Sequence, residues 1–74
     1  MEDTIEKRFD YLRALTKDEM IVMIAELEED IEFLEGILKD PRVSGEQKTD
    51  SRNDIDYDNA KLRALRTLLA EPIL

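Results

Sequence analysis

The densest group of side chains that could do chemistry lies between residues 50 and 59. It contains four carboxylates and two amides: Asp50, Asn53, Asp54, Asp56, Asp58 and Asn59. The order Asp54-x-Asp56-x-Asp58 matches the start of an EF-hand loop, in which alternate side-chain oxygens ligate calcium. The rest of that loop is missing, because Asn59 stands where glycine is needed and Leu65 where a bidentate glutamate is needed. We therefore expect no metal site here.

Other catalytic chemistry has few residues to work with. The chain has no His and no Cys. This removes the usual acid–base side chain near neutral pH, the commonest transition-metal ligand, the thiolate nucleophile and the disulfide. No nucleotide-binding or nucleophile motif appears in the sequence either. We expect a protein that is not an enzyme and that carries no cofactor.

Four basic residues form a second set with possible chemistry, namely Arg13, Lys61, Arg63 and Arg66. Brought together, they could hold a small anion such as a nucleotide. The alternative is that they lie on a solvated face and pair with acids elsewhere in the chain. The formal net charge is −8, which argues against nucleic acid and anionic membranes as partners.

The elements that must position these residues are helices. Between residues 16 and 39, apolar residues recur at alternating gaps of four and three, as in a heptad repeat. We call them the seam of this helix: Met20, Ile24, Leu27, Ile31, Leu34 and Leu38. The run Thr16-Lys17-Asp18-Glu19 has the form of a capping box, and Asp40-Pro41 should stop the helix. The pattern predicts a helix over residues 17–39.

A shorter helix is expected before this one and a second long helix after it. Ile5, Phe9, Leu12 and Leu15 share one stripe and predict a helix over about 3–15, with Asp3 as its cap. Residues 40–53 are expected to form a turn or mobile loop. A second seam then predicts a helix over about 52–70: Ile55, Leu62, Leu65 and Leu69, with Asp58 in the one position that breaks it.

The start of this last helix is open in the sequence. Ser44 could cap a helix that begins near Gly45. Alternatively Asp50, Ser51 or Asp54 caps a later start, which is favoured because residues 45–54 contain no apolar side chain to bury.

These elements predict one all-α domain over residues 1–74. Residues 17–39 and 52–70 should form an antiparallel helical hairpin with coiled-coil-like packing, and residues 3–15 should pack against it. A chain of 74 residues without disulfides must gain its stability from helix packing and self-association. No signal peptide and no membrane span is visible, so a cytoplasmic location is expected.

The predicted pairing leaves part of the first long helix uncovered. Four large apolar residues lie opposite the polar stretch 46–54, namely Phe33, Leu34, Ile37 and Leu38. Large exposed apolar patches usually mark interaction sites, and the nearby acids Glu28, Glu32 and Glu35 would steer a basic partner. The sequence therefore predicts a non-enzymatic protein-interaction module of the adaptor, co-chaperone or inhibitor type, acting as a homo-oligomer.

Two alternative functions remain open at this point. One is a helical oligomer that sequesters a small anion through the four basic residues. The other is an acidic mimic of nucleic acid, carried by residues 26–35 and 50–58. The outline of a short helix and an acidic hairpin is similar to that of secretion co-chaperones and phage anti-defence inhibitors, and the similarity is one of architecture only.

Overall fold

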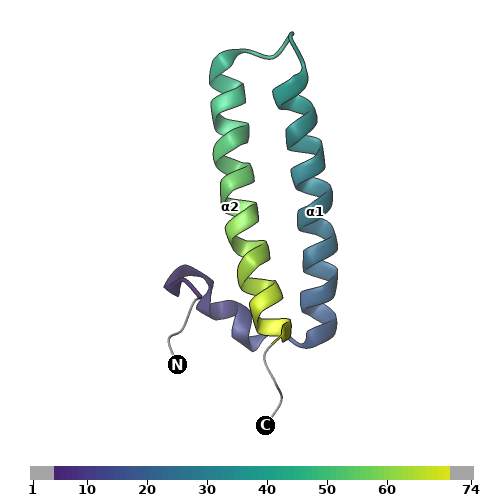
Figure 1. Ribbon diagram of the computed structural model, residues 1–74, viewed down its shortest axis with the longest axis vertical. Helices are drawn as coiled ribbons and strands as arrows, with labels where there is room; N and C mark the ends of the chain where they lie inside the picture. The colour runs from purple at the N-terminus through teal and green to yellow at the C-terminus, as the bar shows by residue number, and fades with distance from the viewer. Residues whose placement is uncertain (1–4, 71–74) are drawn as a thin grey trace.

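Two long antiparallel helices make up most of the molecule (Figure 1). The structure is a computed structural model that describes residues 5–70. Helix α1 spans Lys17–Lys39 and helix α2 spans Gly45–Ala70, and a short helix η1, Lys7–Ala14, lies at the base of the hairpin. The backbone extends over 51 × 23 × 15 Å. The prediction of an all-α helical hairpin with a short N-terminal helix is confirmed.

Helix α1 begins and ends where its sequence predicts. The Thr16 hydroxyl accepts a hydrogen bond from the Glu19 backbone N–H at 3.1 Å, and the Glu19 carboxylate accepts one from the Thr16 N–H at 2.8 Å. This reciprocal capping box satisfies two N–H groups that lack helical partners. At the other end the Asp40 N–H donates to the Ile37 carbonyl at 3.2 Å, and Pro41 prevents continuation.

Helix α2 begins earlier than the expected residue 52, at Gly45. The Gln47 N–H donates to the Ser44 hydroxyl at 3.2 Å, so the Ser44 cap is the alternative that the structure adopts. The expected loop over 40–53 is therefore wrong beyond residue 44. The reason is that a polar segment can still pack on α1, since Ser51 is buried and the Lys48 side chain is half-buried.

The N-terminal helix η1 is a 3₁₀ helix, shorter than the expected 3–15. The Phe9 N–H donates to the Glu6 carbonyl at 2.9 Å, and the Leu15 N–H donates to the Leu12 carbonyl at 3.1 Å. A 3₁₀ helix has three residues per turn, so Phe9, Leu12 and Leu15 fall on one edge of it. The proposed Asp3 cap lies outside the described residues.

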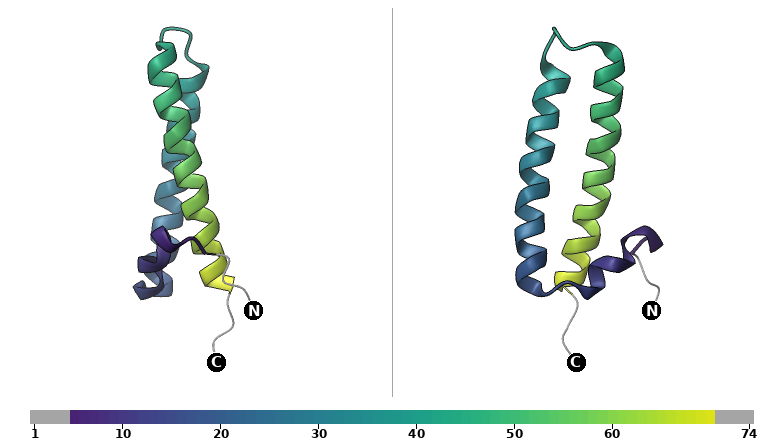
Figure 2. Two further views of the ribbon diagram at one scale, coloured as in Figure 1. Left: turned by 90° about the vertical axis from the view of Figure 1, so that its left-hand side faces the viewer. Right: turned by 180° about the vertical axis from the view of Figure 1, so that it is seen from behind.

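The hydrophobic core lies at the base of the hairpin, where η1 packs against α2 (Figure 2). Phe9, Leu12 and Leu65 have no exposed surface. Further core residues come from the segment before η1, from α1 and from α2: Ile5, Met20, Ala60 and Ala64. The two small alanines on α2 allow η1 to approach closely. Within residues 5–70, the tip of the hairpin has only α1 and α2, and no third helix covers it.

No helix within residues 5–70 has the combination of length and apolar character needed to cross a lipid bilayer.

Candidate functional site

Helix α1 also carries apolar side chains, with acids among them, on the face directed away from α2. At about 100° per residue, five positions lie roughly opposite the seam. We call them the outer face of α1: Val22, Ala25, Glu29, Phe33 and Gly36. All five are exposed, and Phe33 is the most exposed large hydrophobic residue within residues 5–70, at 68%. Because no part of residues 5–70 covers this face, it is the surface of α1 that another molecule can reach.

A shallow groove of about 580 Å³ runs along this face near the tip. Its lining comes entirely from α1 and the residue that follows it: Glu29, Glu32, Phe33, Gly36, Ile37 and Asp40. Phe33 and Ile37 supply the apolar wall, and carboxylates supply the rim. The Asp40 carboxylate accepts hydrogen bonds from the Arg42 guanidinium, which lowers the pKa of Asp40. The Asp40 carboxylate therefore stays negatively charged well below neutral pH.

The four apolar residues predicted to contact a partner differ in how far they are exposed. Phe33 is exposed, and Ile37 and Leu38 are half-buried. Leu34 is only 8% exposed, so the expectation that it lies uncovered is wrong. Its burial follows from the early start of α2, whose first turns run beside the end of α1 (Figure 1). Of the four, Phe33 and Ile37 line the groove and remain available to a partner.

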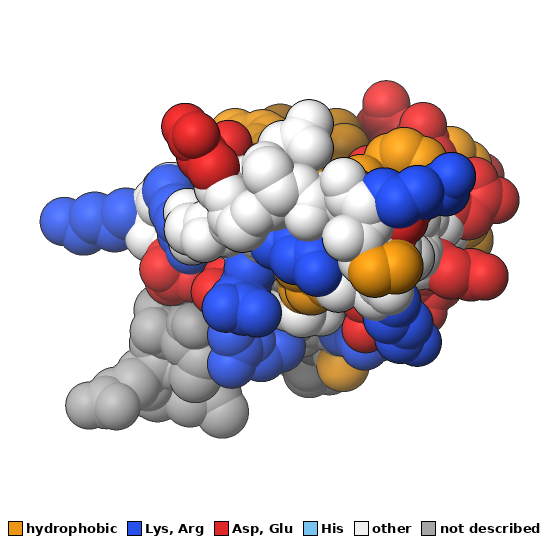
Figure 3. Space-filling view, turned by 90° about the horizontal axis from the view of Figure 1, so that it is seen from above, with side chains coloured by type: hydrophobic (Ala, Val, Ile, Leu, Met, Phe, Trp, Pro, Cys, Tyr) orange, Lys and Arg blue, Asp and Glu red, His pale blue; other side chains and the backbone are white. Residues whose placement is uncertain are grey.

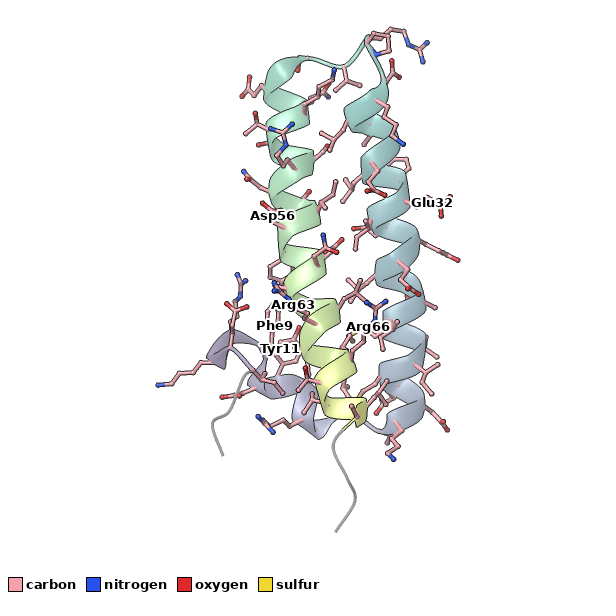
Figure 4. The ribbon with its side chains drawn as sticks, viewed as in Figure 1. Phe9, Tyr11, Glu32, Asp56, Arg63 and Arg66 are labelled. Carbon is pink, nitrogen blue, oxygen red and sulfur yellow. The ribbon has the colours of Figure 1, made fainter. Side chains whose placement is uncertain are left out.

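The three acids predicted to attract a basic partner also lie in different surroundings. The Glu28 carboxylate bonds the Arg66 guanidinium of α2 at 2.9 Å and helps to hold the hairpin. Glu32 points away from α2 at the rim of the groove (Figure 4). Glu35 is exposed. Seen from the tip, acidic side chains gather on the α1 side with hydrophobic side chains among them (Figure 3).

Gly36 stands in the middle of the groove and in the interior of α1. A Cβ built at Gly36 would meet no other atom within 4 Å, and its φ is not positive. Neither close packing within residues 5–70 nor backbone geometry therefore requires glycine there. A glycine inside a helix is destabilising by about 0.5–1 kcal/mol relative to alanine. The residue lowers the stability of α1 and at the same time opens the groove.

The four basic residues predicted to bind an anion lie in different surroundings, and three of them interact with different neighbours. Arg13 forms an ion pair with Asp10 at 3.6 Å, and Arg66 bonds Glu28. The Lys61 ammonium lies 5.6 Å from the centre of the Tyr11 ring. Only Arg63 lines the second groove of the molecule, about 380 Å³ between η1 and α2. Figure 4 places Arg63 on the η1 side of α2 and Arg66 on the side towards α1.

Asp58 is the buried acid of the α1–α2 contact, as its position in the second seam predicts. It is 7% exposed, and its Oδ2 has no hydrogen-bond partner among the described residues. Burial raises the pKa of Asp58 to about 6, with added contributions from the Asp30 carboxyl of α1 and the charge of Asp54, while Lys61 opposes them. At neutral pH this side chain therefore places a poorly solvated charge between the two helices.

No three acidic side chains within residues 5–70 are arranged to hold a metal ion. The EF-hand-like run Asp54-x-Asp56-x-Asp58 lies within helix α2 and not in a loop. On a helix, side chains two residues apart point in different directions, so these three carboxylates do not converge.

Three residues of the groove are absent from the individual residues predicted to bind a partner: Glu29, Gly36 and Asp40. Glu29 is included only as part of the acidic run 26–35. The signal that could have found two of them is the helical wheel. Glu29, Phe33 and Gly36 all fall on the face opposite the seam, so Phe33 belongs to a different face of α1 from the seam residues.

Comparison with protein-family models, with curated proteins and with solved structures gives no match for this chain.

Proposed function

We propose that this protein is a non-enzymatic interaction module that presents the outer face of α1 to a protein partner. The observation that carries the proposal is the 68% exposure of Phe33 beside a groove that its own helix forms. Burying a phenylalanine side chain contributes about 1.5–3 kcal/mol. Aromatic residues, phenylalanine among them, are enriched in the buried cores of protein interfaces.

The groove and the shape of the molecule support a binding role. The smallest dimension of the backbone is 15 Å, which leaves little depth in which to enclose a substrate. The groove is long and shallow, lies along one helix and joins apolar walls to an acidic rim. An extended surface of this type suits docking of a helix or of another folded surface.

The two alternative functions have less support. An anion-sequestering site needs several cations at one place, whereas Arg13, Lys61 and Arg66 each interact with a different neighbour. A mimic of nucleic acid needs a surface dominated by charge. The exposed surface of α1 instead carries Val22 and Phe33, at 59% and 68% exposure, among its acids.

Photo-crosslinking in the cells from which the chain comes tests the proposal. A benzophenone amino acid replaces Phe33 in one variant and Asn59, an exposed residue of α2, in the control variant. Irradiation should link a protein to position 33 and not to position 59. Equal adducts at both positions, or none at position 33, would contradict the proposal.

A further inference from the structure

The outer face of α1 combines features that restrict what can bind there. Gly36 removes side-chain bulk from the centre of the groove, and Ala25 is the next small residue on the same face. Small residues on a helix allow the backbone of a second helix to approach closely. The groove extends from Glu29 to Asp40, which is about three helical turns. These dimensions match the contact that a second helix makes along α1.

The acidic rim of the groove indicates which charge a helix bound there should carry. Within residues 5–70, neither Glu29 nor Glu32 forms an ion pair, and both lie on the rim of the groove. A symmetric pair of chains would place each rim against the same rim of its copy. Each copy also carries a formal net charge of −8. Like charges at an interface are costly and opposite charges favour association, so the complementary partner is basic and is not a second copy.

We propose that the occupant of this groove is a basic amphipathic helix of another protein. One large apolar side chain of this helix lies over Gly36, between Phe33 and Ile37. Its lysine or arginine residues face Glu29 and Glu32. Docking in this way converts the tip of the hairpin from two helices into a three-helix bundle. The inference rests on the proposed function and adds the class of the partner.

Synthetic helices of about 20 residues test this directly by fluorescence anisotropy with the intact chain. The first peptide has a leucine stripe flanked by lysines. The second has the same composition in a scrambled order without a stripe. The third replaces the lysines with glutamates. The striped basic helix should bind at least about ten-fold more tightly than either of the others.

Variants of the chain separate specific docking from attraction of charge. Gly36→Gln fills the groove while favouring the helix, so circular dichroism should show a folded protein, and affinity should fall at least about five-fold. Glu29→Gln with Glu32→Gln should weaken binding several-fold. The control pair, Glu46→Gln with Asp56→Asn, removes the same charge from exposed positions of α2 and should change affinity by less than about two-fold.

The outcomes distinguish this inference from the proposed function. Equal binding of the striped and scrambled peptides would overturn the inference, and so would undiminished binding by Gly36→Gln. If position 33 crosslinks a protein in cells but no basic helix binds, the class of partner is wrong and the interaction surface stands. If the adduct at position 33 is a second copy of this chain, the inference is also overturned. If position 33 crosslinks no protein in cells and no basic helix binds, the proposed function is wrong as well.

Discussion

The base and the tip of the hairpin are built from the same two helices but differ in how their side chains are buried. At the base, three helices meet, and Phe9, Leu12 and Leu65 are completely buried. At the tip of the described residues, α1 and α2 stand alone. Leu34 is buried although the neighbouring part of α2, residues 45–54, has no apolar side chain, and Phe33 is exposed. Asp58 interrupts the second seam between these regions. The contrast indicates that packing is densest at the base, while the tip leaves the large apolar side chain of Phe33 exposed.

The largest expected difference between the two regions comes from truncating their buried leucines. Leu65→Ala should lower the free energy of unfolding by about 2–5 kcal/mol, because it removes methyl groups from a fully enclosed site. Leu34→Ala should cost less, since the thin tip can collapse around the missing atoms. Urea denaturation of both variants measures the difference. An equal or larger loss for Leu34→Ala would show that the tip is packed as well as the base.

Replacing Asp58, the buried acid between the base and the tip, should raise the free energy of unfolding by an amount that depends on pH. The folded state raises the pKa of Asp58 from its usual 3.8 to about 6, so it holds the proton more tightly than the unfolded chain does. The contribution of Asp58 to stability is therefore full below pH 4 and is lost as the pH rises through 6. Asp58→Asn should raise the free energy of unfolding by about 1–2 kcal/mol at pH 7 and change it little near pH 4.

Denaturation of both proteins across this pH range checks the prediction for Asp58. The difference between wild type and Asp58→Asn isolates this group from the other carboxylates, such as Asp40, whose pKa the Arg42 guanidinium lowers. A difference that is constant with pH would mean that Asp58 does not titrate between the helices.

A smaller change of opposite sign to the leucine truncations is expected at Gly36. Gly36→Ala should stabilise the protein by about 0.5–1 kcal/mol, because alanine favours the helix and its methyl group meets no atom within 4 Å. The thermal midpoint by circular dichroism measures this. A lower midpoint would show that the tip needs glycine for its own packing, and the groove would then be a by-product of the fold.

The smallest change in stability is expected from the most exposed residue. Phe33→Ser should alter the free energy of unfolding by less than about 0.5 kcal/mol, since a side chain that is 68% exposed contributes little to the folded state. Urea denaturation beside Leu34→Ala makes the comparison between adjacent residues of one helix. A loss as large as that of Leu34→Ala would place Phe33 in the core and remove the basis of the interaction surface.

The sequence was sufficient to predict those features of the fold for which local signals and periodicity agree. The capping box at Thr16, the stop at Asp40-Pro41, the heptad seam of α1 and the disruptive position of Asp58 are all present in the structure. Each depends on residues within a few turns of one helix. For the same reason the hairpin itself could be predicted.

The remaining features depend on tertiary contacts that periodicity does not reveal. Residues 45–54 lack apolar side chains, so their helix depends on the Ser44 cap and on the neighbouring α1, and Leu34 is buried as a result. The three-residue spacing of Phe9, Leu12 and Leu15 is compatible with both α and 3₁₀ geometry. The groove required the structure, because Gly36 becomes informative only once its empty surroundings are known.

The most direct test of the account is an NMR titration of the isotope-labelled chain with the striped basic helix. Backbone amide shifts should change most between Glu29 and Asp40 of α1, and the base around Phe9, Leu12 and Leu65 should change little. The largest changes in the groove between η1 and α2, or no changes in excess peptide, would contradict the claim that the outer face of α1 is the binding surface.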